Sequence, residues 1–160
     1  MKLIEWNIHK MTNDIPVQQF VVDALVKMDA DIICLVEYLT DKGIVAALER
    51  DYWLEESNSI SGNKVFIAVK KKIASCGIVT VKKDEIVDCY NFLHIDFINN
   101  EGEKLSIIGV RMLSPINAKK QTPPLVKYIK RLENTYICVG DFNIKDYRMN
   151  VWFSNIEMEK

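Results

Sequence analysis

Apolar residues recur along this chain with two different periods, which separate the expected helices from the expected strands. Three segments have apolar positions three or four residues apart, as on one face of a helix: residues 15–28, 41–50 and 123–134. The third segment begins with a pair of prolines, a residue type that is well placed at a helix start. The pattern therefore predicts three helices, the last beginning at Pro123.

Short apolar runs predict the strands. They occupy residues 2–8, 29–38, 52–57, 63–71, 76–82, 91–99, 104–112 and 135–143. Two of these runs are almost continuously apolar, which is typical of strands buried on both faces. The stretch "NNEGEK" at 99–104 has the Asn and Gly content of a hairpin loop. Together the elements predict a mixed α/β chain with helices packed outside extensive sheet.

Length and composition indicate a single domain over residues 1–160. Of the 160 residues, 49% are hydrophobic, which is enough to fill a sizeable core. No repeat, low-complexity tract or Gly/Ser linker divides the chain. Its 21 Lys and Arg residues nearly balance 22 Asp and Glu residues, so the whole protein exerts no general attraction on a polyanion. Any contact with nucleic acid must therefore be local.

The cysteines and the first residues bear on metal content and location. Cys34, Cys76, Cys89 and Cys138 lack the paired spacing of a zinc site, and we interpret them as reduced core thiols. The opening "MKLIEWNIHK" contains a glutamate and no long apolar stretch, so we expect neither a signal peptide nor a membrane anchor. The cytoplasm is the expected compartment.

Polar side chains collect where expected strands end. Asn7 and Glu37 stand at or near the ends of the first two strands, and Asp141 and Asn143 at the end of the last one. Ligand sites in layered α/β folds tend to form at strand ends. A carboxylate there can hold Mg²⁺, a second carboxylate can orient or deprotonate water, and an amide can contact a phosphoryl oxygen without adding negative charge.

Three stretches, in a fixed order, also carry a resemblance to a known family. "IEWNIHK", "DADIICLVEY" and "YICVGDFN" resemble the first motif, the metal-binding strand ending in glutamate, and the Gly-Asp-Phe-Asn motif of the endonuclease/exonuclease/phosphatase superfamily of metal-dependent phosphoesterases. "GNKVFIAVKKK" and "KLSIIGVRM" are similar to two further strands of that family, so the resemblance covers most of residues 1–143. It implies a two-sheet α/β sandwich with outer helices that hydrolyses a phosphate ester, with a phosphodiester as the favoured substrate.

The resemblance also implies roles for the strand-end residues. Glu37 would be the ligand of a divalent cation, Mg²⁺ or Mn²⁺, and Asn7 would line the phosphate and metal site. Asp141 would activate or orient water, and Asn143 would support the phosphate. Where the family usually has a histidine this chain has Arg111, a permanent cation that can bind phosphate but cannot shuttle a proton; a surface ion pair is an equally good interpretation.

A second departure from the family concerns the end of the chain. Residues 144–160 contain no Ser-Asp-His motif, and the only histidines of the sequence are His9 and His94. This predicts a sandwich that is incomplete at the C-terminus, with weak hydrolysis and a tendency of the uncovered sheet edge to pair with another copy.

Several other residues have a structural alternative. Asn63 is a candidate for substrate binding but also fits a hairpin, and His9 could face the same site as Asn7. His94 alternates with neighbouring strand residues and is interpreted as structural, and the lysines at 70–72 as a solvated strand end. Asn7, Asp141 and Asn143 could serve only in turns, and Glu37 could be an exposed acid at a strand end. These alternatives carry less weight because the motifs occur together.

Two hypotheses about function therefore remain open. The first is metal-dependent hydrolysis of a phosphate ester by the 1–160 domain. The second is a degenerate family member that binds a metal, a nucleotide or a protein partner without turnover. The sequence does not choose among DNA, RNA, inositol phosphates, lipids and small nucleotides as substrates.

Overall fold

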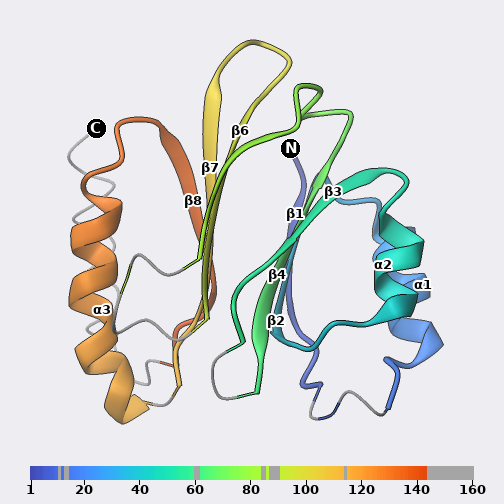
Figure 1. The fold of residues 1–160 in the computed structure, drawn as a ribbon, viewed down its shortest axis with the longest axis horizontal. Helices are drawn as coiled ribbons and strands as arrows, with labels where there is room; N and C mark the ends of the chain where they lie inside the picture. The colour runs from blue at the N-terminus through green and yellow to red at the C-terminus, as the bar shows by residue number, and fades with distance from the viewer. Residues whose placement is uncertain are drawn as a thin grey trace.

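The computed structural model is an α/β sandwich of two sheets with helices on both outer sides (Figure 1). It describes residues 1–10, 12, 15–59, 62–83, 86, 91–113 and 115–143. The described strands are β1 (Leu3–Asn7), β2 (Ile32–Tyr38), β3 (Tyr52–Glu56), β4 (Lys64–Lys70), β5 (Ile78–Lys82), β6 (Phe92–Ile98), β7 (Lys104–Arg111) and β8 (Thr135–Asp141). The described helices are α1 (Gln19–Met28), α2 (Lys42–Leu48) and α3 (Pro115–Ile129).

The two sheets are built on a similar plan. The strand order is β1-β2-β4-β3 in the first sheet and β5-β6-β7-β8 in the second. Each sheet has one parallel pair, β1 with β2 and β7 with β8, and the chain between the two strands of each pair contains a helix. The other neighbouring strands are antiparallel. The expected two-sheet α/β sandwich is confirmed, whereas residues 144–160, on which the expected incomplete C-terminus depends, lie outside the described residues.

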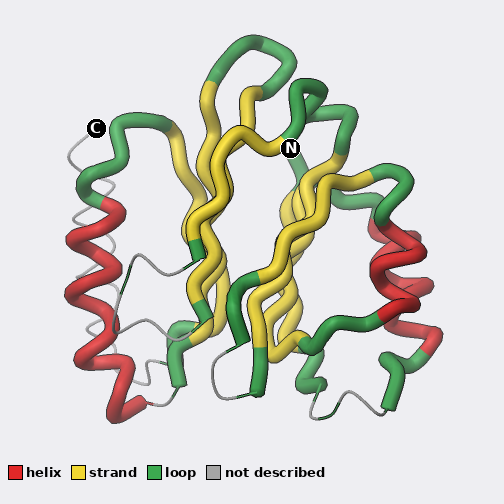
Figure 2. The backbone as a smooth tube through the Cα atoms, in the orientation of Figure 1, coloured by secondary structure: helices red, strands yellow, loops and turns green. Residues whose placement is uncertain are grey.

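Three apolar layers hold the sandwich together. The central layer lies between the sheets and includes Val36, Ile67, Ile95 and Ile107. The helices α1 and α2 cover the outer face of the first sheet, and α3 covers the outer face of the second, as Figure 2 shows. The alternating side chains of each strand therefore enter two different layers, which explains why the central strands are apolar at nearly every position.

Gly109 marks the point of closest contact between the sheets. A Cβ atom at this position in β7 would lie 2.6 Å from Val65 Cγ1 and 3.1 Å from Ile67 Cδ1 of β4. These distances are far below ordinary carbon contacts, so the sheets could not pack as they do with a larger residue. The glycine thus sets the separation of the two sheets just inside the end where the candidate residues lie.

The third helix differs from its sequence prediction. It begins at Pro115 rather than at Pro123, and Pro123 and Pro124 lie inside it. Prolines remove helical hydrogen bonds, yet the helix continues because both sides of the proline pair are anchored in the protein. Gln121 is buried before the pair, and Leu125 is buried after it in the apolar layer beneath α3.

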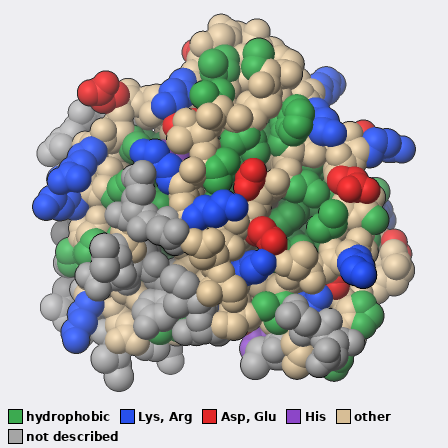
Figure 3. Space-filling view, in the orientation of Figure 1, with side chains coloured by type: hydrophobic (Ala, Val, Ile, Leu, Met, Phe, Trp, Pro, Cys, Tyr) green, Lys and Arg blue, Asp and Glu red, His purple; other side chains and the backbone are tan. Residues whose placement is uncertain are grey.

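Charged side chains of both signs are mixed on the face shown in Figure 3. An ion pair of 3.3 Å between Lys83 Nζ, just after β5, and Glu55 Oε2 in β3 joins the edges of the two sheets. This mixture agrees with the near balance of charges in the sequence and gives the face no field of one sign. In the described part of the chain, no helix combines the length and apolar character needed to cross a membrane.

Candidate active site

Four polar residues lie at the carboxyl ends of the two parallel strand pairs. Asn7 ends β1, Glu37 is the next-to-last residue of β2, Arg111 ends β7 and Asp141 ends β8. Arg111 and Asp141 are direct partners in the β7–β8 ladder, and Asn7 pairs with Val36, the residue before Glu37. Each parallel pair thus brings two candidate residues from distant parts of the sequence to neighbouring positions.

His9 and Glu37 form the first direct contact of the site. His9 Nδ1 lies 2.6 Å from Glu37 Oε2, and the backbone N–H of His9 donates to Asn7 Oδ1 at 3.0 Å. The backbone N–H of Lys10 donates to the Glu37 carbonyl oxygen at 3.0 Å, which fixes the chain after His9 beside β2. The His9 side chain is 72% exposed, whereas that of Glu37 is 14% exposed. The imidazole therefore covers the buried carboxylate from the solvent side.

Arg111 joins the two sheets by reaching the same carboxylate. Its Nη2 lies 3.2 Å from Glu37 Oε1, and its Nη1 donates to Asn91 Oδ1 at 3.4 Å. The Arg111 side chain is only 12% exposed, and its buried Nε has no partner among the described residues. A buried guanidinium with an unused N–H is well suited to an anion that carries several acceptor oxygens.

Asn91 is the residue of this region that the sequence did not indicate. It is 1% exposed, and its Nδ2 donates to the backbone oxygens of Asn58 and Asn63, the former at 3.2 Å. Its backbone oxygen also accepts the N–H of Arg111 at 3.0 Å. Asn91 therefore fixes Arg111 by two contacts and ties it to the segment before β4. An asparagine in front of an expected strand carries no signal that would have distinguished it from a turn residue.

Asp141 and Asn143 form a local unit at the end of β8. Asn143 Nδ2 donates to Asp141 Oδ2 at 2.9 Å and also to the Met112 carbonyl oxygen, while the backbone N–H of Asn143 donates to Asp141 Oδ1 at 3.0 Å. Both amide hydrogens of Asn143 are thus directed at protein oxygens. In this geometry Asn143 holds the carboxylate in place, and its own Oδ1 is the atom left to face a ligand.

Gly140 explains why a glycine precedes the aspartate. Its φ of +136° lies in a region that residues with a side chain rarely adopt, and a Cβ atom would lie 2.0 Å from the Val110 carbonyl oxygen. The backbone of β8 therefore approaches β7 in a way that only glycine allows. This close approach places Asp141 opposite Arg111.

Left-handed backbone conformations are concentrated at the site. Positive φ values occur at His9 (46°), Glu37 (51°), Asn91 (43°) and Asn143 (49°), all of which belong to the contacts described above. At Glu37 the conformation coincides with a register shift in the pairing of β2 with β4. Such conformations cost free energy for residues other than glycine, and they are frequent at functional sites because the surrounding structure enforces them.

The charges around Glu37 and Glu5 have opposite effects on their pKa values. Burial raises the pKa of Glu37, but the hydrogen bonds from His9 and Arg111 outweigh burial and leave the pKa below its ordinary value. Glu5 on β1 has a raised pKa because of burial and because of the negative charge of Asp141. Glu37 is thus held as an anion. The effect of Asp141 on Glu5 reflects the position of β8, which faces β1 across the sandwich.

The donor atoms fit a weakly held divalent cation. Mg²⁺ commonly uses one or two carboxylates and keeps several waters or substrate oxygens. Glu37 supplies one such carboxylate, and the Asn7 amide oxygen lies beside it through their shared contact with His9. Among the described residues there is no group of three or more His, Cys, Asp or Glu side chains that could hold a metal. Most of the coordination would therefore have to come from water and substrate.

The structure brings together most of the predicted site residues. Asn7, His9, Glu37 and Arg111 form a continuous series of contacts, and Asp141 with Asn143 adjoins Arg111 through the β7–β8 pairing. Asn63 takes part through its backbone oxygen, which accepts from Asn91.

His94 lies elsewhere, on the face of the second sheet beneath α3. The lysines at 70–72 follow the far end of β4, and Lys70 pairs with Asp29.

Comparisons with known proteins were made by sequence and by structure. No family model matches the sequence, and no curated protein matches it. Solved structures do match the fold. TDP2 from D. rerio complexed with single strand DNA product is 19% identical with a TM-score of 0.70, and the match covers 98% of this chain and 64% of that one.

Two further structures are similar. ANGEL2, a 2′,3′-cyclic phosphatase, is 14% identical with a TM-score of 0.64 over 89% of this chain and 52% of that one. An endonuclease/exonuclease/phosphatase family protein from Bacteroides thetaiotaomicron is 14% identical with a TM-score of 0.72 over 97% and 68%. The chain spans 48% of TDP2 from C. elegans, so it corresponds to about half to two thirds of the structures it matches. This chain shares the fold of these structures, one of which is an endonuclease/exonuclease/phosphatase family protein, the family that its three ordered motifs resemble.

Proposed function

We propose that this protein hydrolyses a phosphodiester, with the scissile phosphate bound between Arg111 and Asp141. The observation that carries this proposal is the contact of Arg111 with Glu37 across the two sheets, beside the carboxylate of Asp141. A buried cation with an unused N–H and a carboxylate paired with it in the strand ladder provide the two groups that phosphoryl transfer needs most.

Each of these residues has a separate role in the proposed reaction. Arg111 binds the phosphoryl oxygens and stabilises the charge that develops on them. Asp141, oriented by Asn143, accepts a proton from water while the water oxygen forms a bond to phosphorus. The bond from phosphorus to the leaving oxygen breaks, and the leaving alkoxide takes a proton. The exposed imidazole of His9 is placed to give that proton from Nε2, because its Nδ1 faces Glu37.

The proposal also includes a divalent cation, for which Glu37 and Asn7 would be the protein ligands. When bound, it would neutralise part of the phosphate charge and lower the barrier to attack. Glu37 is kept ionised by Arg111 and His9, so the carboxylate is ready for a cation without losing a proton first. Asn7 adds an oxygen without adding negative charge near the anionic substrate.

Two of the similar structures support a nucleic-acid or nucleotide ester as the substrate. D. rerio TDP2 was solved with a single strand DNA product, and ANGEL2 is described as a 2′,3′-cyclic phosphatase. The near-neutral surface of the present chain fits a substrate that is held locally rather than attracted over long range.

The test is hydrolysis of bis(4-nitrophenyl) phosphate and of a short thymidine oligonucleotide, with Mg²⁺ or Mn²⁺ and with a chelator. We expect Asp141→Asn to lower kcat at least about 10²-fold, because a general base normally contributes about 10²–10⁴. Asp51→Asn is the matched control, since Asp51 is an exposed aspartate paired with Arg50 on the surface. Equal rates for the parent and Asp141→Asn would overturn the proposed role.

A binding function without turnover is the second candidate, and one observation favours it. Both oxygens of Glu37 are engaged, Oε2 by His9 and Oε1 by Arg111, so a cation would have to displace one of them. Under this alternative the parent would bind the oligonucleotide but hydrolyse neither ester at any cation concentration. Arg111→Met would weaken binding, and Asp141→Asn would leave it unchanged.

A further inference from the structure

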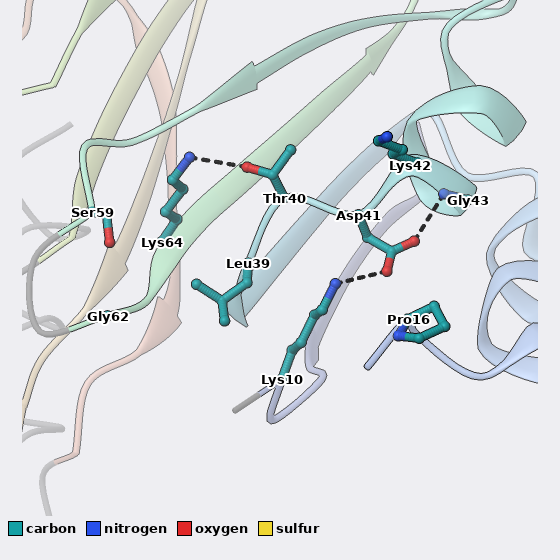
Figure 4. A pocket seen from close by; sticks show the side chains of 10 residues that line it. All are labelled: Lys10, Pro16, Leu39, Thr40, Asp41, Lys42, Gly43, Ser59, Gly62 and Lys64. Atoms are coloured by element: carbon teal, nitrogen blue, oxygen red, sulfur yellow. Dashed lines mark hydrogen bonds and ion pairs between the residues drawn. The ribbon is translucent and has the colours of Figure 1, made fainter. Parts of the chain in front are cut away.

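A pocket lies beside the candidate site and is not used by the proposed reaction. Its volume is about 630 Å³, within the usual range for small-molecule sites. It is lined by Lys10, Pro16, Leu39, Thr40, Asp41, Lys42, Gly43, Ser59, Gly62 and Lys64. Figure 4 shows these residues converging from three segments: the chain after β1, the connection from β2 to α2, and the segment before β4.

The pocket is continuous with the site along two of these segments. Lys10 directly follows His9, and Leu39 comes two residues after Glu37. The hydrogen bond from the Lys10 N–H to the Glu37 carbonyl oxygen holds both segments together at 3.0 Å. Since two residues of extended chain span at most about 7 Å, a ligand bound at Glu37 can extend directly into the pocket.

One wall of the pocket is a buried ion pair. Lys10 Nζ lies 2.7 Å from Asp41 Oδ2, and the two side chains are 6% and 3% exposed. Burial raises the pKa of Asp41, but Lys10 and the backbone N–H groups of Val17 and Ile44 outweigh it and keep the pKa below its ordinary value. The carboxylate is therefore fully engaged, whereas the ammonium group of Lys10 has three hydrogens and one described bond.

At the opposite wall, three side chains are hydrogen-bonded to one another. Lys64 Nζ donates to Thr40 Oγ1 at 3.0 Å and to Glu56 Oε1 at 2.9 Å, and Thr40 itself donates to Glu56 Oε2 at 2.9 Å. Lys42, at the rim, is exposed and has no described side-chain partner. Asp41 neutralises Lys10 and Glu56 neutralises Lys64, so among the described residues that line the pocket Lys42 is the one positive charge without a compensating carboxylate.

These properties select a ligand with one negative charge and an apolar part. Leu39 and Pro16 provide apolar surface, and the ammonium groups of Lys10 and Lys42 provide donors. A single internucleotide phosphodiester carries one negative charge and is joined to a base that can lie on apolar surface. A phosphomonoester or a polyphosphate carries more charge than one uncompensated lysine balances.

We infer that the pocket binds the nucleotide next to the scissile phosphodiester, so that the protein prefers a chain of at least two nucleotides over an isolated phosphate ester. This inference rests on the proposed function, since it uses the phosphate position between Arg111 and Asp141. The base lies against Leu39 and Pro16, and its phosphate lies near Lys42.

The experiment compares KM and kcat for two substrates, bis(4-nitrophenyl) phosphate and a thymidine dinucleotide carrying a 4-nitrophenyl ester. Lys42→Met should raise KM for the dinucleotide about tenfold, the equivalent of one lost hydrogen bond to a charged group. Its kcat for the dinucleotide, and both constants for bis(4-nitrophenyl) phosphate, should stay unchanged. Lys127→Met on α3 makes the same change of charge on the far side of the molecule and should affect neither substrate.

The possible outcomes distinguish a failure of the pocket inference from a failure of the proposed function. Equal KM values of the parent and Lys42→Met for the dinucleotide would overturn the pocket inference while leaving hydrolysis intact. Stronger competition by inositol hexakisphosphate than by thymidine dinucleotide would also overturn it, in favour of a site for several anionic groups. If the parent hydrolyses neither ester, the proposed function fails. Fluorescence anisotropy with labelled dinucleotide then decides the inference, with a tenfold weaker Kd for Lys42→Met in its favour and an equal Kd against it.

Discussion

Two histidines of this chain contact carboxylates, and their surroundings differ sharply. The ring of His94 is 2% exposed, with Nε2 2.8 Å from Asp96 Oδ1 and Nδ1 2.6 Å from the hydroxyl of Tyr128. The ring of His9 is 72% exposed and has one described ring contact, to Glu37. One histidine is therefore satisfied on both nitrogens inside the protein, and the other presents Nε2 to the outside.

The carboxylates differ in the same way. Asp96 accepts from the Ser106 hydroxyl and lies 2.9 Å from Lys104 Nζ in addition to its contact with His94. All of these partners come from regular strand positions in β6 and β7. Glu37 instead stands in a left-handed conformation and faces a guanidinium that has an unused N–H.

The comparison distinguishes a structural polar cluster from a site that is arranged for a ligand. A buried network with every atom paired stabilises the packing of α3 on its sheet. A cluster that combines strained backbone, an exposed ring and an unpaired donor has interactions left over for another molecule. The chemical identity of the residues, a histidine beside a carboxylate, does not separate the two cases.

The largest expected effect is on catalysis, from His9→Asn. Asparagine tolerates the positive φ at this position, so the change removes the imidazole with little disturbance of the backbone. We expect kcat to fall about 10²-fold, at the lower end of general acid–base contributions, and the unfolding free energy to change by less than about 0.5 kcal/mol. An unchanged kcat on bis(4-nitrophenyl) phosphate would show that His9 does not transfer a proton.

The same substitution at the other histidine should have the opposite result. His94→Asn cannot reach Tyr128 and Asp96 together, so the half-buried Tyr128 hydroxyl or the buried Asp96 carboxylate loses a partner. We expect a loss of about 2–3 kcal/mol in unfolding free energy, measured by urea denaturation, with kcat unchanged in the folded protein. A stable variant with reduced kcat would break the distinction drawn between the two pairs.

A smaller effect is expected from Asn91, which acts through Arg111. Asn91→Gly keeps the left-handed backbone but removes the contacts to Arg111, Asn58 and Asn63. Because the guanidinium of Arg111 is then less well oriented for binding, KM for a phosphodiester should rise about tenfold, with a smaller effect on kcat. Asn91→Asp keeps the acceptor for Arg111 and should restore part of the affinity.

The control for Asn91 is Asn100→Gly, an exposed position in the turn after β6. It should leave KM unchanged. If Asn91→Asp and Asn91→Gly raise KM equally, the contact between Asn91 Oδ1 and Arg111 does not position the cation.

The buried pair also predicts a dependence of stability on pH. Burial raises the pKa of Asp96, but Ser106, Lys104 and His94 outweigh burial and leave the pKa below its ordinary value. The folded protein then binds fewer protons than the unfolded chain, so this contribution is present above the unfolded pKa of about 3.9 and is lost as pH falls through the lower, folded pKa. The stability difference between the parent and Asp96→Asn should therefore shrink as the pH is lowered below about 4. A constant difference in urea denaturation would contradict this.

The smallest expected effect is that of a divalent cation on melting. Millimolar Mg²⁺ or Mn²⁺ should stabilise the parent by about 0.4 kcal/mol when its concentration equals Kd. Glu37→Gln should abolish the shift in Tm, and Asp96→Asn should keep it. Equal Tm shifts for the parent and Asp141→Asn would show that Asp141 is not part of the cation-binding site.

The sequence predicted most of the fold because the strands carry strong apolar patterns. Each of the eight expected strand segments contains one of the described strands, and the expected helices at 15–28 and 41–50 contain α1 and α2. The start of α3 was predicted wrongly because the proline pair is a strong local signal for a helix start. What keeps the earlier turns helical is packing, including burial of Gln121 and Thr122, and this packing depends on segments distant in sequence.

The candidate site was predictable only where a residue belongs to a motif. Glu37 and Asp141 stand in recognisable stretches, and the structure places them at the ends of β2 and β8, which face each other across the sandwich. Asn91 was missed because its role comes from contacts with Asn58, Asn63 and Arg111, which no local spacing reveals. The pocket was missed for the same reason, since its lining comes from three separate segments.

The position of β8 opposite β1 affects the order in which the candidate site forms during folding. Asn7 ends the first strand of the chain and Asp141 ends the last described one, so the two sides of the site are among the most distant pairs in sequence. Contacts of long sequence separation form slowly because the intervening chain must first be ordered. During synthesis the β1-α1-β2 unit can fold while β8 is still to be made, but the proposed phosphate position between Arg111 and Asp141 requires both β7 and β8. Under this proposal, ligand binding becomes possible only after β8 has joined the second sheet.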